Sequence, residues 1–212
     1  MKRRVVITGM GAVTPLGNTV AETWEGICRG RSGVAPITRF DCTAFETKIA
    51  GEVKGFDPLR YVNKKELRRV DDFIVYALAA AEMAMADAGL TIEEEGAERT
   101  GVIIGSAIGG LATIEKEKEA IFQGGPRKMS PFTIPAALAN LAAGHVSIRF
   151  RAKGPINCPV TACASGTCAI GDAARIIADG YADVMIAGGV DAAVTPLCVA
   201  GFNAMRALSR RN

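Results

Sequence analysis

The sequence predicts an α/β protein in which a largely parallel sheet carries helices on both faces. Apolar strand-like runs alternate with helix-like runs over short connections, as in residues 100–110 followed by 111–122. The strand-like runs are apolar along their whole length, as strands buried on both faces are. The chain has 24 glycines and only 6% aromatic residues, a composition that suits closely packed layers.

The N-terminal part of the chain predicts a strand, a turn and a helix. The run RRVVITGMG over residues 3–11 is expected to form a buried strand that leads into a glycine turn. Asn18 or Thr19 then offers a side-chain oxygen to cap a helix through AETWEGICRG, and Gly30 ends that helix. Residues 31–62 are rich in turn formers and are expected to be irregular.

The rest of the chain continues the alternation of strands and helices. Residues 71–90 are apolar around most of a helical circumference and end near Gly89, which predicts a helix packed on several sides. The run at 100–110 predicts a strand followed by a glycine turn, and the continuous apolar run at 182–190 predicts another strand. The other expected elements are a helix over 111–122, a buried helix over 133–150, a short strand over 156–162 and a helix over 164–179. Because no linker or low-complexity tract interrupts this order, we expect one domain.

Charge and hydropathy argue against several classes of function. The net charge of +3 is small, and the basic residues have acidic neighbours and no aromatic platform, so nucleic-acid binding is not expected. No apolar run approaches the roughly 18 residues that cross a bilayer, so no membrane insertion is expected. The first residues imitate a signal peptide, but Gly9, Gly11 and Pro15 interrupt the apolar part and favour a strand and turn.

The cysteines and glycine motifs indicate no cofactor. Six cysteines without a C-x-x-C pair favour reduced thiols and a cytoplasmic location. Cys158, Cys163 and Cys168 recur every five residues, a spacing that does not suit a tetrahedral zinc site. The Gly-Met-Gly run at 9–11 suggests a dinucleotide loop, but Thr14 occupies the position of the third glycine. We therefore expect no metal and no cofactor, and we interpret the cysteines other than Cys163 as structural.

Cys163 is the candidate nucleophile. It lies where the predicted strand 156–162 ends and the predicted helix 164–179 begins. A helix start presents free N–H groups and a partial positive charge, both of which favour a thiolate and an oxyanion. The neighbours that keep the approach open are Ala162, Ala164, Ser165 and Gly166. The residues alone leave open the alternative that Cys163 is a small inert side chain of the core.

Four stretches of the chain resemble one enzyme family in the same order. They are RRVVITGMGAVTPLG, GSAIGGL, GPINCPVTACASG and the run from TACASG to ALSRRN. The chain resembles the β-ketoacyl-[acyl-carrier-protein] synthases, and most closely the type II elongating enzymes of bacterial fatty acid synthesis. The resemblance covers residues 1–212. It implies a thiolase-like layered fold, a duplicated α/β architecture of which this chain is the N-terminal half and from which the C-terminal half is absent.

The resemblance also implies roles for particular residues. Cys163 matches the nucleophile that takes an acyl chain from acyl carrier protein as a thioester, before a decarboxylative Claisen condensation with malonyl-acyl carrier protein. Ile108 in GSAIGGL matches a residue that gates the acyl pocket, and Phe202 in AGFNAMRALS matches a gate beside the cysteine. Ordinary core packing is the alternative for Ile108 and Phe202.

One departure from the family concerns histidine. The condensation step of the family needs two histidines and a lysine, all of which lie in its second half. This chain contains one histidine, His145, which lies in the apolar run LAAGHVSIRF, corresponds to neither catalytic histidine and is interpreted as structural. The resemblance therefore implies that the chain alone does not complete the condensation.

A cluster of basic residues predicts an acidic partner. In VNKKELRRVDD, Lys64 and Arg68, and likewise Lys65 and Arg69, are four residues apart and would share one helical face. Clustered positive charge steers an acidic partner electrostatically. The family uses such positions against its acyl carrier protein, and further matches are Arg127, Lys128 and Arg206. A solvated helix face is the alternative.

The expected assembly and two alternative functions complete the prediction. The family forms a homodimer through the region around 133–160, where the strand near Ile156–Val160 pairs across a twofold axis. A thiolase has the same fold and a nucleophilic cysteine at the same junction, but TACASG and the basic cluster fit a synthase better. A non-catalytic half that binds an acyl carrier, or that pairs with a catalytic subunit, is the alternative from another class.

Overall fold

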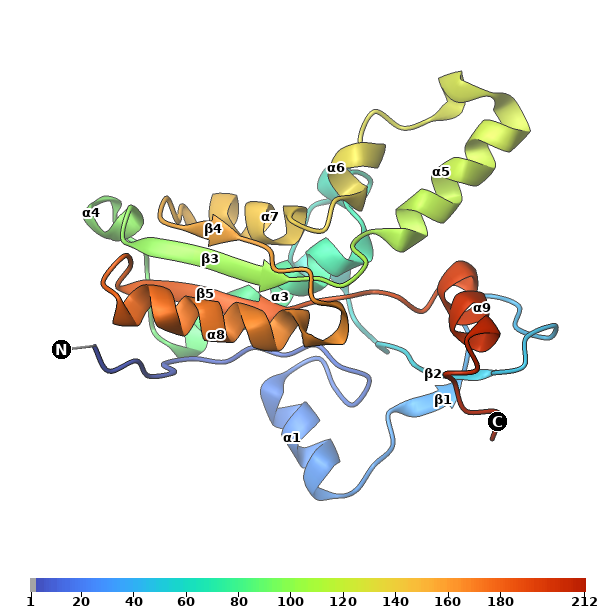
Figure 1. Ribbon diagram of the computed structural model, residues 1–212, viewed down its shortest axis with the longest axis horizontal. Helices are drawn as coiled ribbons and strands as arrows, with labels where there is room; N and C mark the ends of the chain where they lie inside the picture. The colour runs from blue at the N-terminus through green and yellow to red at the C-terminus, as the bar shows by residue number, and fades with distance from the viewer. Residues whose placement is uncertain (1–2) are drawn as a thin grey trace. The chain divides into compact units, whose positions relative to one another are not determined.

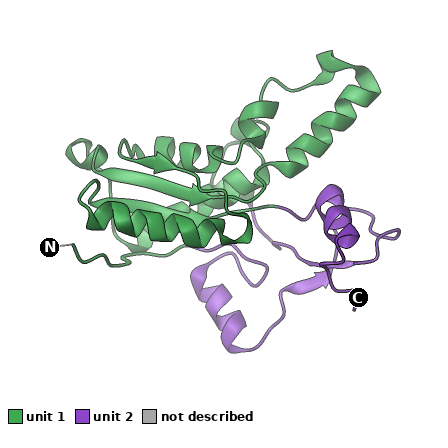
Figure 2. Cartoon of the chain, in the orientation of Figure 1, with its two compact units in different colours: residues 1–11, 58–192 green, residues 12–57, 193–212 purple. Residues whose placement is uncertain are grey.

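The computed structural model describes residues 3–212, which fall into two compact units (Figure 2). Unit 1 consists of the residues up to Gly11 together with Pro58–Ala192. Unit 2 consists of Ala12–Asp57 together with Ala193–Asn212. The sequence pattern predicted one domain, whereas the chain divides into two units that are each assembled from separate stretches.

The parallel sheet of unit 1 agrees with the prediction. Its central strand is β3 (Thr100–Gly105), with β4 (Ile156–Asn157) on one side and β5 (Val184–Gly189) on the other, all parallel (Figure 1). β3 and β5 pair along their whole length, whereas only two residue pairs join β3 to β4. The strand predicted over 156–162 is therefore much shorter than expected.

Helices cover both faces of the sheet, as the apolar strands predicted. On one face, α7 (Leu141–Phe150) packs against β3, and α3 (Asp72–Asp87) packs against α7. On the other face, α8 (Ser165–Ala178) packs against β3 and β5 (Figure 1). Every residue of β3 is buried. The largest fully buried side chains are Phe73, Ile74, Val75, Val102, Ile103 and Val146.

The buried strand predicted over residues 3–11 is wrong. The described part of this run has no strand, and Val6 and Ile7 are 61% and 78% exposed. Its backbone bonds to helices instead of to a neighbouring strand, because Met10 N donates to the Asp87 carboxylate at 2.9 Å and Arg3 N donates to the Ala178 carbonyl at 3.3 Å.

Two glycines explain why the N-terminal run lies so close to α3. A Cβ atom at Gly9 would collide with the Ala84 carbonyl, and one at Gly11 would collide with the Ala80 carbonyl. The glycines thus allow the backbone to touch the helix directly, a packing that strand-forming side chains would prevent.

The long helix predicted over 133–150 is two helices. α6 (Thr133–Ala137) and α7 are separated by a break at Leu138, whose backbone is extended. The break follows from the loop before α5 (Leu111–Gly124), because Gly110 N donates to the Ala137 carbonyl at 3.0 Å. That carbonyl therefore bonds to another loop instead of continuing the helix.

Unit 2 contains the predicted first helix and a hairpin that the sequence did not reveal. α1 (Val20–Cys28) is capped by the Thr19 side chain, which accepts from Glu22 N. In the stretch predicted to be irregular, β1 (Val34–Pro36) pairs antiparallel with β2 (Ile49–Gly51). Helix α9 (Pro196–Ala204) follows Thr195, whose side chain caps it.

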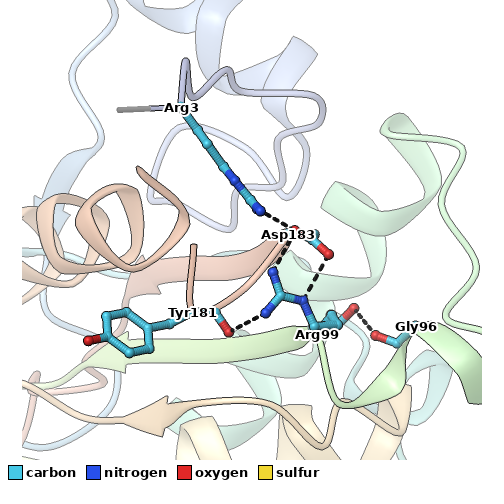
Figure 3. Close-up of polar contacts among 6 residues, drawn as sticks. Arg3, Gly96, Arg99, Tyr181 and Asp183 are labelled. Atoms are coloured by element: carbon cyan, nitrogen blue, oxygen red, sulfur yellow. Dashed lines mark hydrogen bonds and ion pairs between the residues drawn. The ribbon is translucent and has the colours of Figure 1, made fainter. Parts of the chain in front are cut away.

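The remaining elements of unit 1 are short. They are η1 (Pro58–Arg60), α2 (Lys64–Leu67), α4 (Glu94–Ala97), η2 (Pro126–Lys128) and η3 (Ala162–Ala164). At the start of β5, the Asp183 carboxylate binds Arg99 and Arg3 together, and Arg99 also donates to the Tyr181 carbonyl (Figure 3). Among the described residues, no helix is both long and apolar enough to span a membrane.

Candidate functional site

Cys163 lies at the start of α8, as the sequence predicted. It belongs to the single turn η3, which joins directly to α8, and its side chain is exposed. The residue before it, Ala162, has a φ of 51°, in the left-handed region that L-amino acids disfavour. The chain therefore makes a sharp turn immediately before the thiol, as the small residues around Cys163 allow.

The ends of β3 and β5 receive the first turn of α8 at very short range. A Cβ atom at Gly105 would collide with the Ser165 carbonyl, and one at Gly189 would crowd Gly166. These glycines let the helix start rest on the carboxyl ends of two parallel strands. In open parallel α/β sheets, this edge is where ligands bind.

Ile108 lies in the turn between β3 and α5, and Asp191 fixes that turn. The Asp191 carboxylate accepts from Ala107 N at 3.0 Å, from Ile108 N at 3.1 Å and from Ser106 Oγ at 3.0 Å. The Ser106 hydroxyl also accepts from Gly109 N at 3.0 Å. The backbone that carries Ile108 is thus held by side chains at the ends of β3 and β5.

Two titratable groups of unit 1 have perturbed environments. Burial raises the pKa of the Cys158 thiol, and the negative charge of Asp191 raises this pKa further. A hydrogen bond with the Ser106 backbone lowers it, but the net change is upward. Burial lowers the pKa of His145. The negative charge of Glu66 raises this pKa and the positive charge of Arg149 lowers it, and the net change is downward. Each environment disfavours the charged form, which suits the structural roles assigned to Cys158 and His145.

The four clustered basic residues come together, but not on one helix. α2 begins at a capping box of Asn63 and Glu66 and ends at Leu67 after a single turn, with Arg68 as its C-cap. An open pocket of about 420 Å³ is nevertheless lined by Lys64, Lys65, Arg68, Arg69 and Phe132. The Arg69 guanidinium lies 4.5 Å from the centroid of the Phe132 ring, a cation–π contact that fixes its position.

The other predicted site residues lie elsewhere. Arg127 and Lys128 form η2 and do not line that pocket. Phe202 in α9 and Arg206 just after it belong to unit 2. The predicted placement of Phe202 beside the cysteine stays a prediction. Cys28, which the sequence analysis interpreted as structural, is exposed.

Sequence reasoning missed Phe132 and Asp191 in this region, and it noted only the small size of Ser165. Phe132 is remote in sequence from the basic cluster, and only the fold brings it to the pocket. Asp191 follows a glycine-rich strand end, and a carboxylate directly after a buried strand is a signal that could have pointed to it. Ser165 is one of several small residues near Cys163, and its role depends on a turn geometry that the sequence does not reveal.

The fold and the cysteine at the helix start define a class of protein. Parallel strands, helices on both faces and a thiol at the start of α8 are the features of a thiolase-like α/β protein. Residues 2–212 match the model of the β-ketoacyl synthase N-terminal domain, so the chain belongs to the β-ketoacyl synthase family.

Known proteins that resemble the chain agree with this family. A 3-oxoacyl-[acyl-carrier-protein] synthase 2 of Coxiella burnetii is 53% identical over 211 residues, which are 100% of this chain and 51% of that protein. The ishigamide ketosynthase/chain length factor has a TM-score of 0.89 and 34% identity, over 99% of this chain and 52% of the other.

A third similar structure contains a carrier protein. It is a type II polyketide acyl-carrier protein in complex with its ketosynthase bound to the hexaketide, with a TM-score of 0.83 and 27% identity. The match covers 97% of this chain and 55% of that one. The chain thus spans about half the length of the proteins it matches.

Proposed function

We propose that this chain is the nucleophile-bearing half of a 3-oxoacyl-[acyl-carrier-protein] synthase, with Cys163 as the residue that carries the acyl group. One observation carries the proposal: the Cys163 thiol is exposed, at a sharp turn into α8, in a chain that belongs to the β-ketoacyl synthase family. The cytoplasmic location expected from the cysteines belongs to the same proposal.

The first step is transfer of an acyl group to sulfur. The Cys163 thiolate attacks the carbonyl carbon of an acyl thioester, and a tetrahedral intermediate forms with negative charge on the carbonyl oxygen. Backbone N–H groups at a helix start stabilise such an oxyanion. When the intermediate collapses, the bond to the carrier sulfur breaks, the carrier thiolate leaves and takes up a proton, and the acyl group stays on Cys163.

The second step requires groups that this chain does not contain. Loss of CO₂ from a malonyl thioester leaves an enolate, which attacks the Cys163 thioester and releases the cysteine thiolate. Hydrogen-bond donors that stabilise the enolate are needed, and in the family two histidines supply them. The only histidine of the chain is His145, on α7 and half-buried. A second half of the enzyme would therefore supply these donors, and the thiolase and non-catalytic alternatives are not favoured by the family match.

Intact-mass measurement tests the acylation step. The protein is incubated with an acyl-carrier thioester, and we expect one acyl adduct in the wild type and none in Cys163→Ala. Cys28→Ala is the matched control, because Cys28 is also an exposed thiol, and it should retain the adduct. An adduct that persists in Cys163→Ala, or binding of the carrier without any adduct, contradicts the proposal. Condensation by this chain alone would contradict the assignment of the histidines to a second half.

The basic pocket supports docking of the acidic acyl carrier protein. Lys64, Lys65 and Arg68 line the same pocket as the Arg69–Phe132 pair. An apolar ring framed by cations suits a partner that presents acidic side chains around an apolar contact. Arg127 and Lys128 in unit 1, and Arg206 in unit 2, are proposed as further contacts of the carrier outside this pocket.

Charge reversal tests the docking surface. Arg69→Glu should slow association with the carrier about tenfold, and the wild-type rate should fall as salt rises from about 0.05 to about 0.3 M. Arg175→Glu is the control, because Arg175 lies on α8 and pairs with Asp172. Stopped-flow fluorescence with a labelled carrier measures both. Equal slowing in the two variants would contradict a specific surface.

The edge strand β4 supports a homodimer. β4 is one of the two outer strands of the sheet, so one row of its backbone groups has no strand partner among the described residues. Ile156 is exposed on this strand, and nearby in sequence so are Ile134, Leu138, Ile148 and Val160. A second copy that pairs along β4 would cover both features.

A further inference from the structure

Ala162 holds a backbone conformation that alanine disfavours. Its φ of 51° lies in the left-handed region, which is populated about tenfold less readily by an L-amino acid than the right-handed one. Because Ala162 directly precedes Cys163, this conformation decides where the thiol points. A strained residue next to a reactive group persists only where its surroundings hold it.

The Ser165 hydroxyl makes two hydrogen bonds that bracket the strained residue. It donates to the Ala162 carbonyl at 2.7 Å and accepts from Thr161 N at 2.9 Å. The serine is 3% exposed, so water does not replace these bonds readily.

This pattern differs from that of a serine that caps a helix. A capping serine accepts from an N–H two or three residues later in the chain. Ser165 instead accepts from Thr161 N, four residues earlier, and therefore ties the turn that contains Cys163.

We call the two hydrogen bonds of the Ser165 hydroxyl, to the Ala162 carbonyl and from Thr161 N, the serine clamp. This serine clamp is held against the sheet. The Ser165 carbonyl lies against the backbone of Gly105 at the end of β3, where a Cβ atom would collide with it. Movement of Ser165 away from the turn would therefore require α8 to move from the strand ends.

We infer that Ser165 is a positioning residue that holds Cys163 in the placement from which it takes an acyl group. The inference rests on the proposed function, because it concerns the rate of that transfer. Ser165 itself does not touch the reacting atoms; it acts through the backbone of Ala162. Its hydroxyl sets the share of time for which each molecule holds the thiol in that placement, so its loss lowers the rate constant of transfer, while every molecule still reacts in the end.

Single-turnover acylation tests the inference. With an acyl-carrier thioester in excess, Ser165→Ala should lower the rate constant for the Cys163 adduct about tenfold, the penalty of the left-handed conformation, with unchanged amplitude. The concentration of half-saturation should stay within about twofold, because carrier docking is not altered. A lower amplitude with an unchanged rate constant would mean a folding defect and would overturn the inference.

A second substitution distinguishes positioning from general damage. Glycine adopts a positive φ without penalty, so Ala162→Gly in the Ser165→Ala background should restore the rate constant at least about threefold. If the double variant is as slow as Ser165→Ala, the hydroxyl does not act through Ala162 and the inference fails.

The chain offers a matched control at its other serine clamp. Arg151 also has a positive φ, of 57°, and the Ser147 hydroxyl donates to the neighbouring Ala152 carbonyl at 2.7 Å. Ser147→Ala and Ser165→Ala should lower the melting temperature by similar amounts. Only Ser165→Ala should change the acylation rate constant. Equal slowing in both serine variants would overturn a specific role for Ser165.

Alkylation separates this inference from the proposed function. If the wild type forms no acyl adduct, the proposed function fails. The rate at which the Cys163 thiolate displaces iodide from iodoacetamide, located by peptide mass spectrometry, still reports the placement of the thiol. A fall of about threefold or more in Ser165→Ala supports the clamp, and equal rates overturn it.

Discussion

At the residue scale, the Asp183 carboxylate joins three parts of unit 1. It accepts from Arg99 Nη2 at 2.8 Å and from Arg3 Nη1 at 2.6 Å, so the N-terminal run, the start of β3 and the start of β5 meet at one charge (Figure 3). Hydrogen bonds from Arg99 and Arg3 hold the pKa of Asp183 well below its usual range. About half of each side chain is exposed, so solvent and salt weaken the pairs.

Asp183→Asn should flatten the response of stability to acid. Because the folded-state pKa of Asp183 lies below its unfolded value of about 4, its contribution is complete above that pH and is lost as the pH falls through the folded-state pKa. Urea midpoints measured from about pH 6 to about pH 2 should therefore decline more steeply in the wild type. Glu95→Gln, at an exposed carboxylate, is the control and should follow the wild type. Parallel curves for Asp183→Asn and the wild type would contradict this assignment.

At the scale of elements, backbone-to-backbone contact sets the position of α8. Gly189 at the end of β5 touches Gly166 in the first turn of the helix. Its neighbour Gly188 has nothing within 4 Å of the place where a Cβ would lie. Two adjacent glycines of one strand thus differ completely in their surroundings.

Gly189→Ala should destabilise the protein, and Gly188→Ala should not. The added methyl at 189 must push α8 from the sheet, an overpacking that lowers the free energy of unfolding by about 1–3 kcal/mol. At position 188 the change should stay within about 0.5 kcal/mol. Chemical denaturation followed by circular dichroism measures both. Similar losses in the two variants would mean that close packing of α8 is not the cause.

At the scale of the whole molecule, the proposed homodimer depends on the β4 edge of the sheet. β4 contributes only two residue pairs to the sheet, and its side chain Ile156 is 53% exposed. An apolar edge strand of this kind promotes pairing with another chain. The proposed homodimer uses that edge, and its stability should depend on a single side chain there.

Ile156→Lys should shift the protein from dimer to monomer. A buried lysine on a dimer edge is unfavourable, and lysine is the residue that natural sheets use to protect edges. Sedimentation velocity should show the mass halved at equal concentration. Tyr181→Lys is the control, because Tyr181 is also a large exposed side chain, before β5. A monomeric wild type, or a dimeric Ile156→Lys protein, would contradict the proposed interface.

Much of the fold could be predicted from local signals. The paired strands β3 and β5 and the helices α3, α5 and α8 follow from apolar periodicity and from glycine stops. The same signals placed Cys163 at a helix start. In each case the residues that decide the structure are neighbours in sequence.

The errors arise where distant residues decide. The run over 3–11 has the composition of a strand, but in the described structure it pairs with no strand. Its glycines contact α3 instead, and its backbone bonds to Asp87. The helix over 133–150 is broken by a loop that precedes α5. Phe132 and Asp191 were not predicted for the same reason, because the residues that they contact, Arg69 and Ile108, lie far away in the chain.

The discontinuous build of unit 2 has a consequence for synthesis on the ribosome. The Thr47 hydroxyl donates to the Ser209 carbonyl at 2.7 Å, and Lys48 N donates to the Asn212 side chain at 2.6 Å, across separations of 162 and 164 residues. At roughly 5–20 residues per second, the stretch Ala12–Asp57 emerges roughly ten seconds before Ala193–Asn212, the other stretch of unit 2. The nascent chain therefore exposes a half-formed unit while Pro58–Ala192 is already being translated, and during this interval a chaperone or a protease has access to it.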